Sequence, residues 1–154
     1  MTSDESSKAL LKLQALCARK EYCTSEIRKK ALKMTEGDGD AAEDLVSSLV
    51  ADRFVDDLRY ASAFARDKAH LDGWGPVKIR YQLGVKGIPS QIISEALSEI
   101  EDEKAKSRLA SILEAKYRTL KDDPEVRLKL LKFALTRGYE YSDADKAVRD
   151  ILGG

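Results

Sequence analysis

Residues 54–88, which read FVDDLRYASAFARDKAHLDGWGPVKIRYQLGVKGI, decide the fold. An acidic pair, Asp56-Asp57, opens the first part of this stretch, and acidic side chains stabilise a helix at its N-terminus. Apolar and small residues then recur at helical spacing. They are Tyr60, Ala61, Phe64, Ala65 and Leu71. The pattern predicts an amphipathic helix over residues 56–71.

The rest of the stretch predicts a turn and a second helix. Gly73-Trp74-Gly75 interrupts the first pattern, and Pro76 restarts it, because proline is well accommodated in the first turn of a helix. Ile79 and Leu83 supply an apolar face up to residue 85, and a glycine stop follows at Gly87. The charges between Gly73 and Ile88 are all basic: Lys78, Arg80 and Lys86.

The rest of the chain repeats this plan. Ile27-Arg28 corresponds to Ile79-Arg80, and Tyr22 occupies the turn of its repeat that Trp74 occupies in the next one. Arg137-Gly138-Tyr139 corresponds in the same way to residues 86–88. Further helices are expected over residues 7–19, 25–34, 41–52, 89–101 and 102–120, then one opened by Asp123-Pro124 and one capped by Ser142. We therefore predict an all-α fold of three tandem three-helix repeats, residues 7–54, 55–101 and 102–154, after a disordered N-terminus, residues 1–6. Stacked repeats of this period form an elongated, curved solenoid.

Composition points to a folded domain whose charge is arranged in patches. The 154 residues are 43% hydrophobic and 35% charged, with 27 basic and 27 acidic side chains, so the formal net charge is zero. Residues 38–57 are strongly acidic, whereas residues 127–137 carry bases and no acid. Such a distribution favours a protein partner, or a mixed protein and nucleic-acid partner, over free DNA.

The sequence offers no catalytic, cofactor or metal site. The single histidine, His70, is interpreted as a surface residue near a helix end, and Cys17 and Cys23 have neither a metal nor a redox spacing. We expect two reduced thiols in a cytoplasmic, non-enzymatic protein. A membrane span and a signal peptide are not expected, because the chain has no long apolar run and no basic start.

The 54–88 stretch resembles the RecX family. The pattern "aspartate, x, Arg-Tyr-Ala, two residues, Phe" stands at 57–64, and "Gly, two residues, Lys-Ile-Arg, two residues, Leu" stands at 75–83. The resemblance is sharp over about residues 54–100 and looser over residues 19–40. It implies a helical-repeat regulator of the RecA recombinase, which lodges in the groove of the RecA filament on single-stranded DNA. There it would restrain filament growth, ATP hydrolysis and strand exchange.

The sequence also suggests which residues contact a partner. The candidates are Arg59, Arg66, Trp74, Lys78, Arg80 and Lys86. Trp74 has two interpretations, an aromatic that closes the repeat core and a partly exposed anchor for a partner, since tryptophan is a favoured hot spot. Stacking of the repeats would align their basic second helices in one stripe. A monomer that binds RecA, with weak binding to DNA, is the leading hypothesis. The alternatives are a helical module that acts directly on DNA, a plain scaffold and, last, an enzyme.

Overall fold

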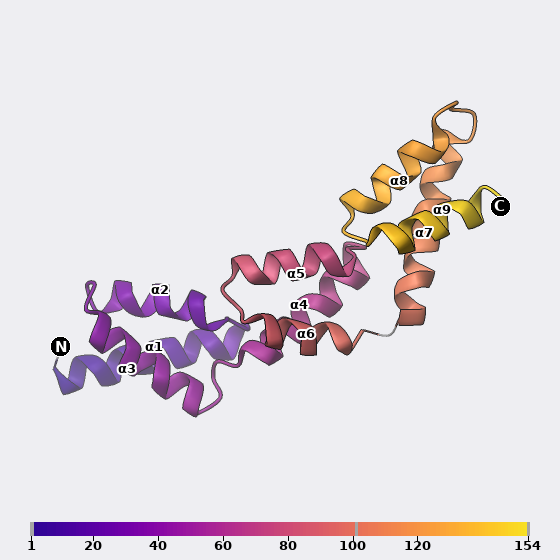
Figure 1. The fold of residues 1–154 in the computed structure, drawn as a ribbon. Helices are drawn as coiled ribbons and strands as arrows, with labels where there is room; N and C mark the ends of the chain where they lie inside the picture. Colours follow the sequence, from indigo (N-terminus) through magenta and orange to yellow (C-terminus); the bar gives the residue numbers. More distant parts are fainter. Residues whose placement is uncertain (1, 101, 154) are drawn as a thin grey trace. The chain divides into compact units, whose positions relative to one another are not determined.

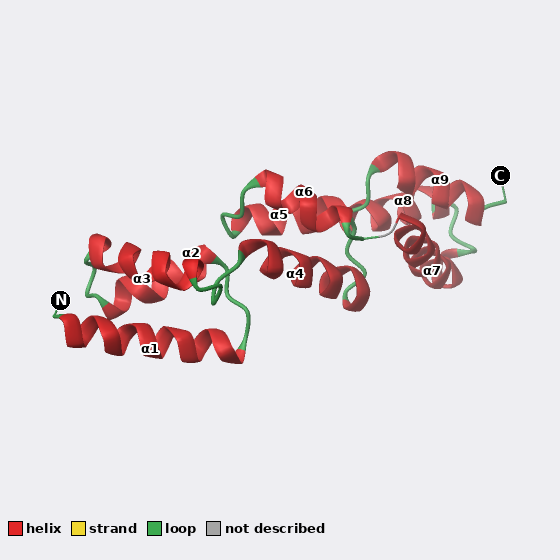
Figure 2. Cartoon of the chain, turned by 90° about the horizontal axis from the view of Figure 1, so that it is seen from below, coloured by secondary structure: helices red, strands yellow, loops and turns green. Residues whose placement is uncertain are grey.

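The computed structural model describes residues 2–100 and 102–153, and within these ranges it contains nine helices and no strand (Figure 1, Figure 2). The helices are α1 (Ser3–Arg19), α2 (Thr24–Met34), α3 (Gly39–Ala51), α4 (Asp57–Leu71), α5 (Pro76–Val85), α6 (Ser90–Ser98), α7 (Asp102–Leu120), α8 (Val126–Thr136) and α9 (Tyr141–Ile151). The prediction of an all-α fold is confirmed.

The helices pack into two compact units, one of residues 1–61 with 84–93 and the other of residues 62–83 with 94–154. In the first unit, α1, α2 and α3 enclose a core that includes Leu13, Ile27, Ala31, Leu45 and Leu49. In the second, α7, α8 and α9 enclose Leu109, Leu113, Leu130, Ala134 and Val148. Because each unit takes part of α4, α5 and α6, the predicted repeat boundaries at residues 54/55 and 101/102 remain predictions.

Short polar side chains begin several helices. The Thr2 hydroxyl accepts a hydrogen bond from Glu5 N (3.1 Å), Asp38 Oδ1 accepts one from Ala41 N (3.1 Å), and Asp56 Oδ1 accepts one from Arg59 N (3.0 Å). Each bond satisfies an amide that has no partner inside its own helix. The starts of α1, α3 and α4 are therefore fixed by local chemistry.

Four details of the sequence predictions are corrected. Helix α1 begins at Ser3, so residues 3–6 are helical, because Thr2 caps a first turn that carries Asp4 and Glu5; Met1 lies outside the described residues. Helix α8 begins at Val126, since Asp123 and Pro124 form a turn in which Asp123 Oδ1 accepts from Glu125 N. The N-cap of α9 is Glu140, and Ser142 lies inside the helix. Leu71 belongs to the predicted apolar pattern of residues 56–71, but its side chain is 81% exposed and lies outside the core.

The buried face of α4 is made of small side chains. Ala61, Ala65 and Ala69 are buried, as is Ser62, whereas Phe64 is only half-buried. Small residues allow neighbouring helices to approach closely, so the larger apolar residues of the 56–71 pattern lie beside the buried face and do not form it.

In the second unit, the start of α5 docks on the end of α8 through two backbone hydrogen bonds. Gly75 N donates to Arg137 O (2.8 Å) and Val77 N donates to Gly138 O (2.9 Å). The first amides of a helix and the last carbonyls of another are the groups that lack partners within their own helices, so each end satisfies the other. A Cβ added to Gly75 would lie 2.5 Å from Gly138 O, so residue 75 must be glycine for this contact to form.

Gly138 gives a direct test of this docking. Its φ is +95°, and a Cβ there would lie 2.7 Å from Lys78 N. We expect Gly138→Ala to lower the free energy of unfolding by about 2–4 kcal/mol, from left-handed strain and the backbone clash together, as measured by urea denaturation.

Gly84→Ala is the matched control, because nothing lies within 4 Å of a Cβ at this helical position. It should stabilise the protein by about 0.5–1 kcal/mol. Equal small effects of the two substitutions would contradict a tight contact between α5 and α8.

Candidate partner-binding surfaces

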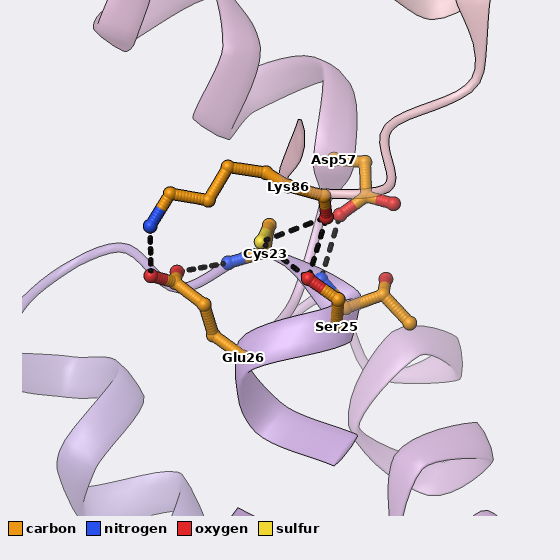
Figure 3. A network of polar contacts seen from close by, with 6 residues as sticks. Cys23, Ser25, Glu26, Asp57 and Lys86 are labelled. Atoms are coloured by element: carbon orange, nitrogen blue, oxygen red, sulfur yellow. Dashed lines mark hydrogen bonds and ion pairs between the residues drawn. The ribbon is translucent and has the colours of Figure 1, made fainter. Parts of the chain in front are cut away.

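In the first unit, the end of α5 is held against the start of α2 by a polar network (Figure 3). The carbonyl of Lys86 accepts hydrogen bonds from Ser25 Oγ (2.5 Å) and Cys23 Sγ (3.9 Å). The Nζ of the same lysine lies 3.0 Å from Glu26 Oε2. Glu26 in turn accepts from Cys23 N at 3.0 Å, which caps α2. Lys86 thus contacts α2 through both its backbone and its side chain.

This network shifts two pKa values. Burial raises the pKa of Glu26, but hydrogen bonds from Cys23 N and Lys86, together with the Lys86 charge, outweigh burial and set it below its ordinary value of 4.5. The hydrogen bond with Glu26 raises the pKa of Lys86 above its ordinary value of 10.5. Both groups are therefore charged across the neutral range, and the ion pair is present there.

Arg59 also holds the first unit together. Its Nε donates to Glu21 Oε2, Nη1 to the carbonyl of Arg53 (3.2 Å) and Nη2 to the carbonyl of Phe54 (3.3 Å). These bonds tie α4 to the segment between α1 and α2 and to the segment that follows α3. The side chain is still 44% exposed, so it keeps an accessible edge.

The second unit places two cations close to the ring of Trp74. Lys68 Nζ lies 4.9 Å from the ring centroid and Lys78 Nζ lies 4.6 Å from it. The Phe64 ring meets the indole at an angle of 67°, with the centroids 6.2 Å apart. The indole is half-buried, so part of it packs inside the unit and part of it stays accessible. Cation–π contacts of this kind are worth about 0.5–1 kcal/mol each at exposed sites.

Beside this cluster, α5 exposes an apolar and basic surface. Val77 is 48% exposed, Tyr81 is 68% exposed, and Arg80 is exposed and donates from Nη1 to Ser94 Oγ (3.2 Å). We call Trp74, Val77, Lys78, Arg80 and Tyr81 the α5 patch. Exposed aromatic and apolar side chains among cations are typical of protein-binding surfaces.

The structure divides the six predicted contact residues between the two units. Arg59 and Lys86 belong to the first unit, and Arg66, Trp74, Lys78 and Arg80 belong to the second. Arg66 is 64% exposed and lies 4.0 Å from Glu99. Sequence reasoning missed Val77 and Tyr81. The sequence of α5 could have indicated both residues, because helical spacing puts Val77 and Tyr81 on the side opposite the buried Ile79 and Leu83.

The described residues give little support for a metal site, for a disulfide or for a membrane-spanning helix. Among residues 2–100 and 102–153, no group of three or more His, Cys, Asp or Glu side chains could hold a metal ion. Cys17 and Cys23 are free thiols, and burial raises the pKa of Cys17. Within the same ranges, none of the helices has the length and apolar character needed to span a bilayer.

Comparison with known proteins identifies the family. The model of the second three-helix domain of RecX matches residues 56–97. A regulatory protein RecX of Prosthecochloris aestuarii is 30% identical over 153 residues, which cover 99% of this chain and 99% of the relative. The chain belongs to the RecX family.

Other RecX proteins extend the comparison. A regulatory protein RecX of Lactococcus lactis subsp. cremoris is 31% identical over 131 residues, and the match covers 82% of this chain but 49% of the relative. The chain thus spans about half the length of that protein. The crystal structure of RecX from Lactobacillus salivarius has a TM-score of 0.87 over 98% of this chain and 99% of that one, at 20% identity, and supports the fold. The domain match includes the whole α5 patch.

The Lys86–Glu26 pair predicts a pH-dependent contribution to stability. We expect Glu26→Gln to cost about 1 kcal/mol at neutral pH, after allowance for solvent screening at half-exposed Lys86. Because the folded pKa of Glu26 is depressed, the contribution is present above the ordinary value of 4.5 and is lost as pH falls through the lower folded value. Urea denaturation of both proteins as a function of pH measures it.

The difference between the wild type and the Glu26→Gln variant should therefore be constant near neutrality and shrink in acid. It should also shrink at high pH, as Lys86 loses its proton above its ordinary value of 10.5. A difference that stays the same from acid to neutral pH would show that charge at Glu26 does not hold the two helices together.

Proposed function

We propose that this protein regulates RecA by binding the RecA filament on single-stranded DNA and restraining filament growth, ATP hydrolysis and strand exchange. The observation that carries the proposal is full-length similarity to a regulatory protein RecX, together with the family pattern in residues 54–88. RecX resemblance implies RecA as the partner. No catalytic residue is needed for such a role, since binding energy alone can shift an assembly equilibrium.

The charge distribution supports a filament over bare DNA. The formal net charge is zero, so long-range attraction to phosphates is weak. A RecA filament instead offers protein surface and DNA together. The α5 patch suits such a target, because Trp74, Val77 and Tyr81 provide apolar contact area while Lys78 and Arg80 provide positive charge.

Preference for the assembled filament follows if the chain touches more than one RecA subunit. Once one contact forms, the next is made at high effective concentration, so weak contacts add up only on neighbouring subunits. Binding that favours particular arrangements of subunits also restrains their addition and loss. We therefore propose that few molecules suffice to affect many RecA subunits.

RecA ATPase activity on single-stranded DNA tests this proposal. Added well below one molecule per RecA, the protein should inhibit ATP hydrolysis. The double variant Lys78→Glu with Arg80→Glu should need about tenfold more protein for the same inhibition, because it places acids on the α5 patch. Its unfolding free energy should fall by only about 0.5–1 kcal/mol, through loss of the cation–π contact between Lys78 and Trp74.

Lys8→Glu with Lys12→Glu is the matched control, since it makes the same change in net charge at exposed positions of α1. This control should inhibit as the wild type does. Equal loss in both double variants would show that overall charge, and not the α5 patch, governs inhibition. Lack of inhibition by the wild type, with firm binding to bare DNA, would favour the direct nucleic-acid module.

A further inference from the structure

Helix α8 exposes leucines on the side that faces away from the core of the second unit. Leu128 is 62% exposed, Leu135 is 41% exposed, and Leu131 between them is half-buried at the edge of the core. The opposite side of the helix carries Leu130 and Ala134, which are buried against α7 and α9. The core therefore uses one side of α8 and leaves a second apolar side uncovered. We call Leu128, Leu131 and Leu135 the α8 stripe.

The spacing of the α8 stripe is that of one strand of a coiled coil. Leu131 follows Leu128 by three positions and Leu135 follows Leu131 by four, which places the leucines at successive a, d and a positions of a heptad. Side chains with this spacing form a narrow seam, and the side chains of a facing helix fit into it as knobs into holes. The stripe therefore suits a helix better than it suits an extended peptide or a flat surface.

Lys132 gives this surface a positive charge. It lies one turn from both Leu128 and Leu135 along the helix, its side chain is exposed, and within the described chain it has neither an ion pair nor a hydrogen bond. The sequence of α8 contains no acid. Glu125, the acid that precedes the helix, is its N-cap and lies beyond the end of the stripe. The ammonium of Lys132 is therefore available to an acid of a partner.

The other cations of this segment are already engaged to different degrees. Arg127 Nη2 lies 3.1 Å from Asp145 Oδ1, and Lys129 Nζ lies 2.6 Å from Asp123 Oδ2. These two pairs hold α8 to neighbouring parts of the fold, so we do not count them as binding groups. Arg137 donates from Nη1 to a backbone carbonyl at 2.7 Å and keeps its charge at the end of the helix. Lys132 is thus the cation on which the sign of the surface depends.

Charge and apolarity together decide between possible occupants. Two copies of α8 packed along their leucines would bring their basic flanks together with no acid on either helix, and like charges across a helix pair repel. A phosphate backbone could meet Lys132 but would leave the leucines in contact with water or charge. An acidic helix with apolar residues on one side satisfies both parts of the surface.

We propose that the α8 stripe binds an acidic amphipathic helix of a protein partner. Large apolar side chains of that helix cover Leu128 and Leu135, and a carboxylate on its flank pairs with Lys132. The α8 stripe shares no residue with the α5 patch, and the argument for it does not rest on the proposed role in RecA regulation. A test that contains no RecA therefore separates the two proposals.

The probe is a terminally blocked peptide of about three heptads, with leucine at the a and d positions and glutamate at all others. Its glutamates repel one another, so it does not pair with itself at neutral pH. The full chain is titrated into the fluorescently labelled peptide and binding is followed by anisotropy. We expect saturable binding that weakens as salt is added, together with a gain of peptide helix in circular dichroism.

Variants of α8 test where the peptide binds. Leu128→Gln with Leu135→Gln should weaken peptide binding by about tenfold or more, and Lys132→Glu alone should weaken it by about fivefold. The lysine variant keeps the test decisive if the leucine variant disturbs folding, because Lys132 is exposed and without a partner in the described chain. Its midpoint of urea denaturation should equal that of the wild type.

Leu11→Gln with Val50→Gln is the matched control. Leu11 is 65% exposed on α1 and Val50 is 45% exposed on α3, so the control removes apolar surface at two positions of similar exposure in the first unit. It should bind the peptide as the wild type does, and so should Lys12→Glu, the control for charge. Equal weakening in the α8 variants and these controls would overturn the proposal.

Further probes test the other occupants. Absence of binding to the acidic peptide, or equal binding of a peptide with lysine in place of every glutamate, would overturn the proposal. Sedimentation of the wild type as a dimer that Leu128→Gln with Leu135→Gln abolishes would assign the stripe to a second copy and overturn it as well. Binding of an oligothymidylate that Lys132→Glu removes, without binding of the acidic peptide, would overturn it in favour of nucleic acid.

Discussion

The contact between the start of one helix and the end of another is the interaction on which each unit depends. In the second unit, Gly75 N and Val77 N donate to the carbonyls of Arg137 and Gly138. In the first, Ser25 and Cys23 donate through their side chains to the carbonyl of Lys86. Glycine at position 75 lets two backbones hydrogen-bond directly. At the start of α2, the side chains of Cys23 and Ser25 instead bridge the two backbones. Both versions satisfy helix ends that would otherwise lack partners.

Much of the fold could be predicted from the sequence because its signals are local. Glycines with positive φ at 73, 87 and 138 mark the breaks, and the first and last residues of α7 match the prediction. The errors arose where two local signals competed. Asp123 and Pro124 can begin a helix, but Asp123 instead turns the chain toward Glu125 N and binds Lys129 Nζ at 2.6 Å. Leu71 follows the helical spacing of its neighbours, yet the small residues of α4 form the buried face.

The candidate surfaces were less predictable, because the role of a charged residue depends on what the fold brings near it. From the sequence, Arg59 and Lys86 are interpreted as free surface cations. In the first unit, however, Arg59 pairs with Glu21 and Lys86 pairs with Glu26, and both acids are far away along the chain. Trp74 is both structural and accessible, so its two interpretations are compatible.

The central claim is that this RecX-family chain recognises the assembled RecA filament. Equilibrium binding to three targets tests it most directly: RecA filaments on single-stranded DNA, RecA without DNA, and the same DNA without RecA. We predict that the filament is bound most tightly, by about tenfold or more over either component, because only the filament offers neighbouring subunits. Equal affinity for the filament and for bare DNA would contradict the account and leave RecX membership as a statement about fold and family.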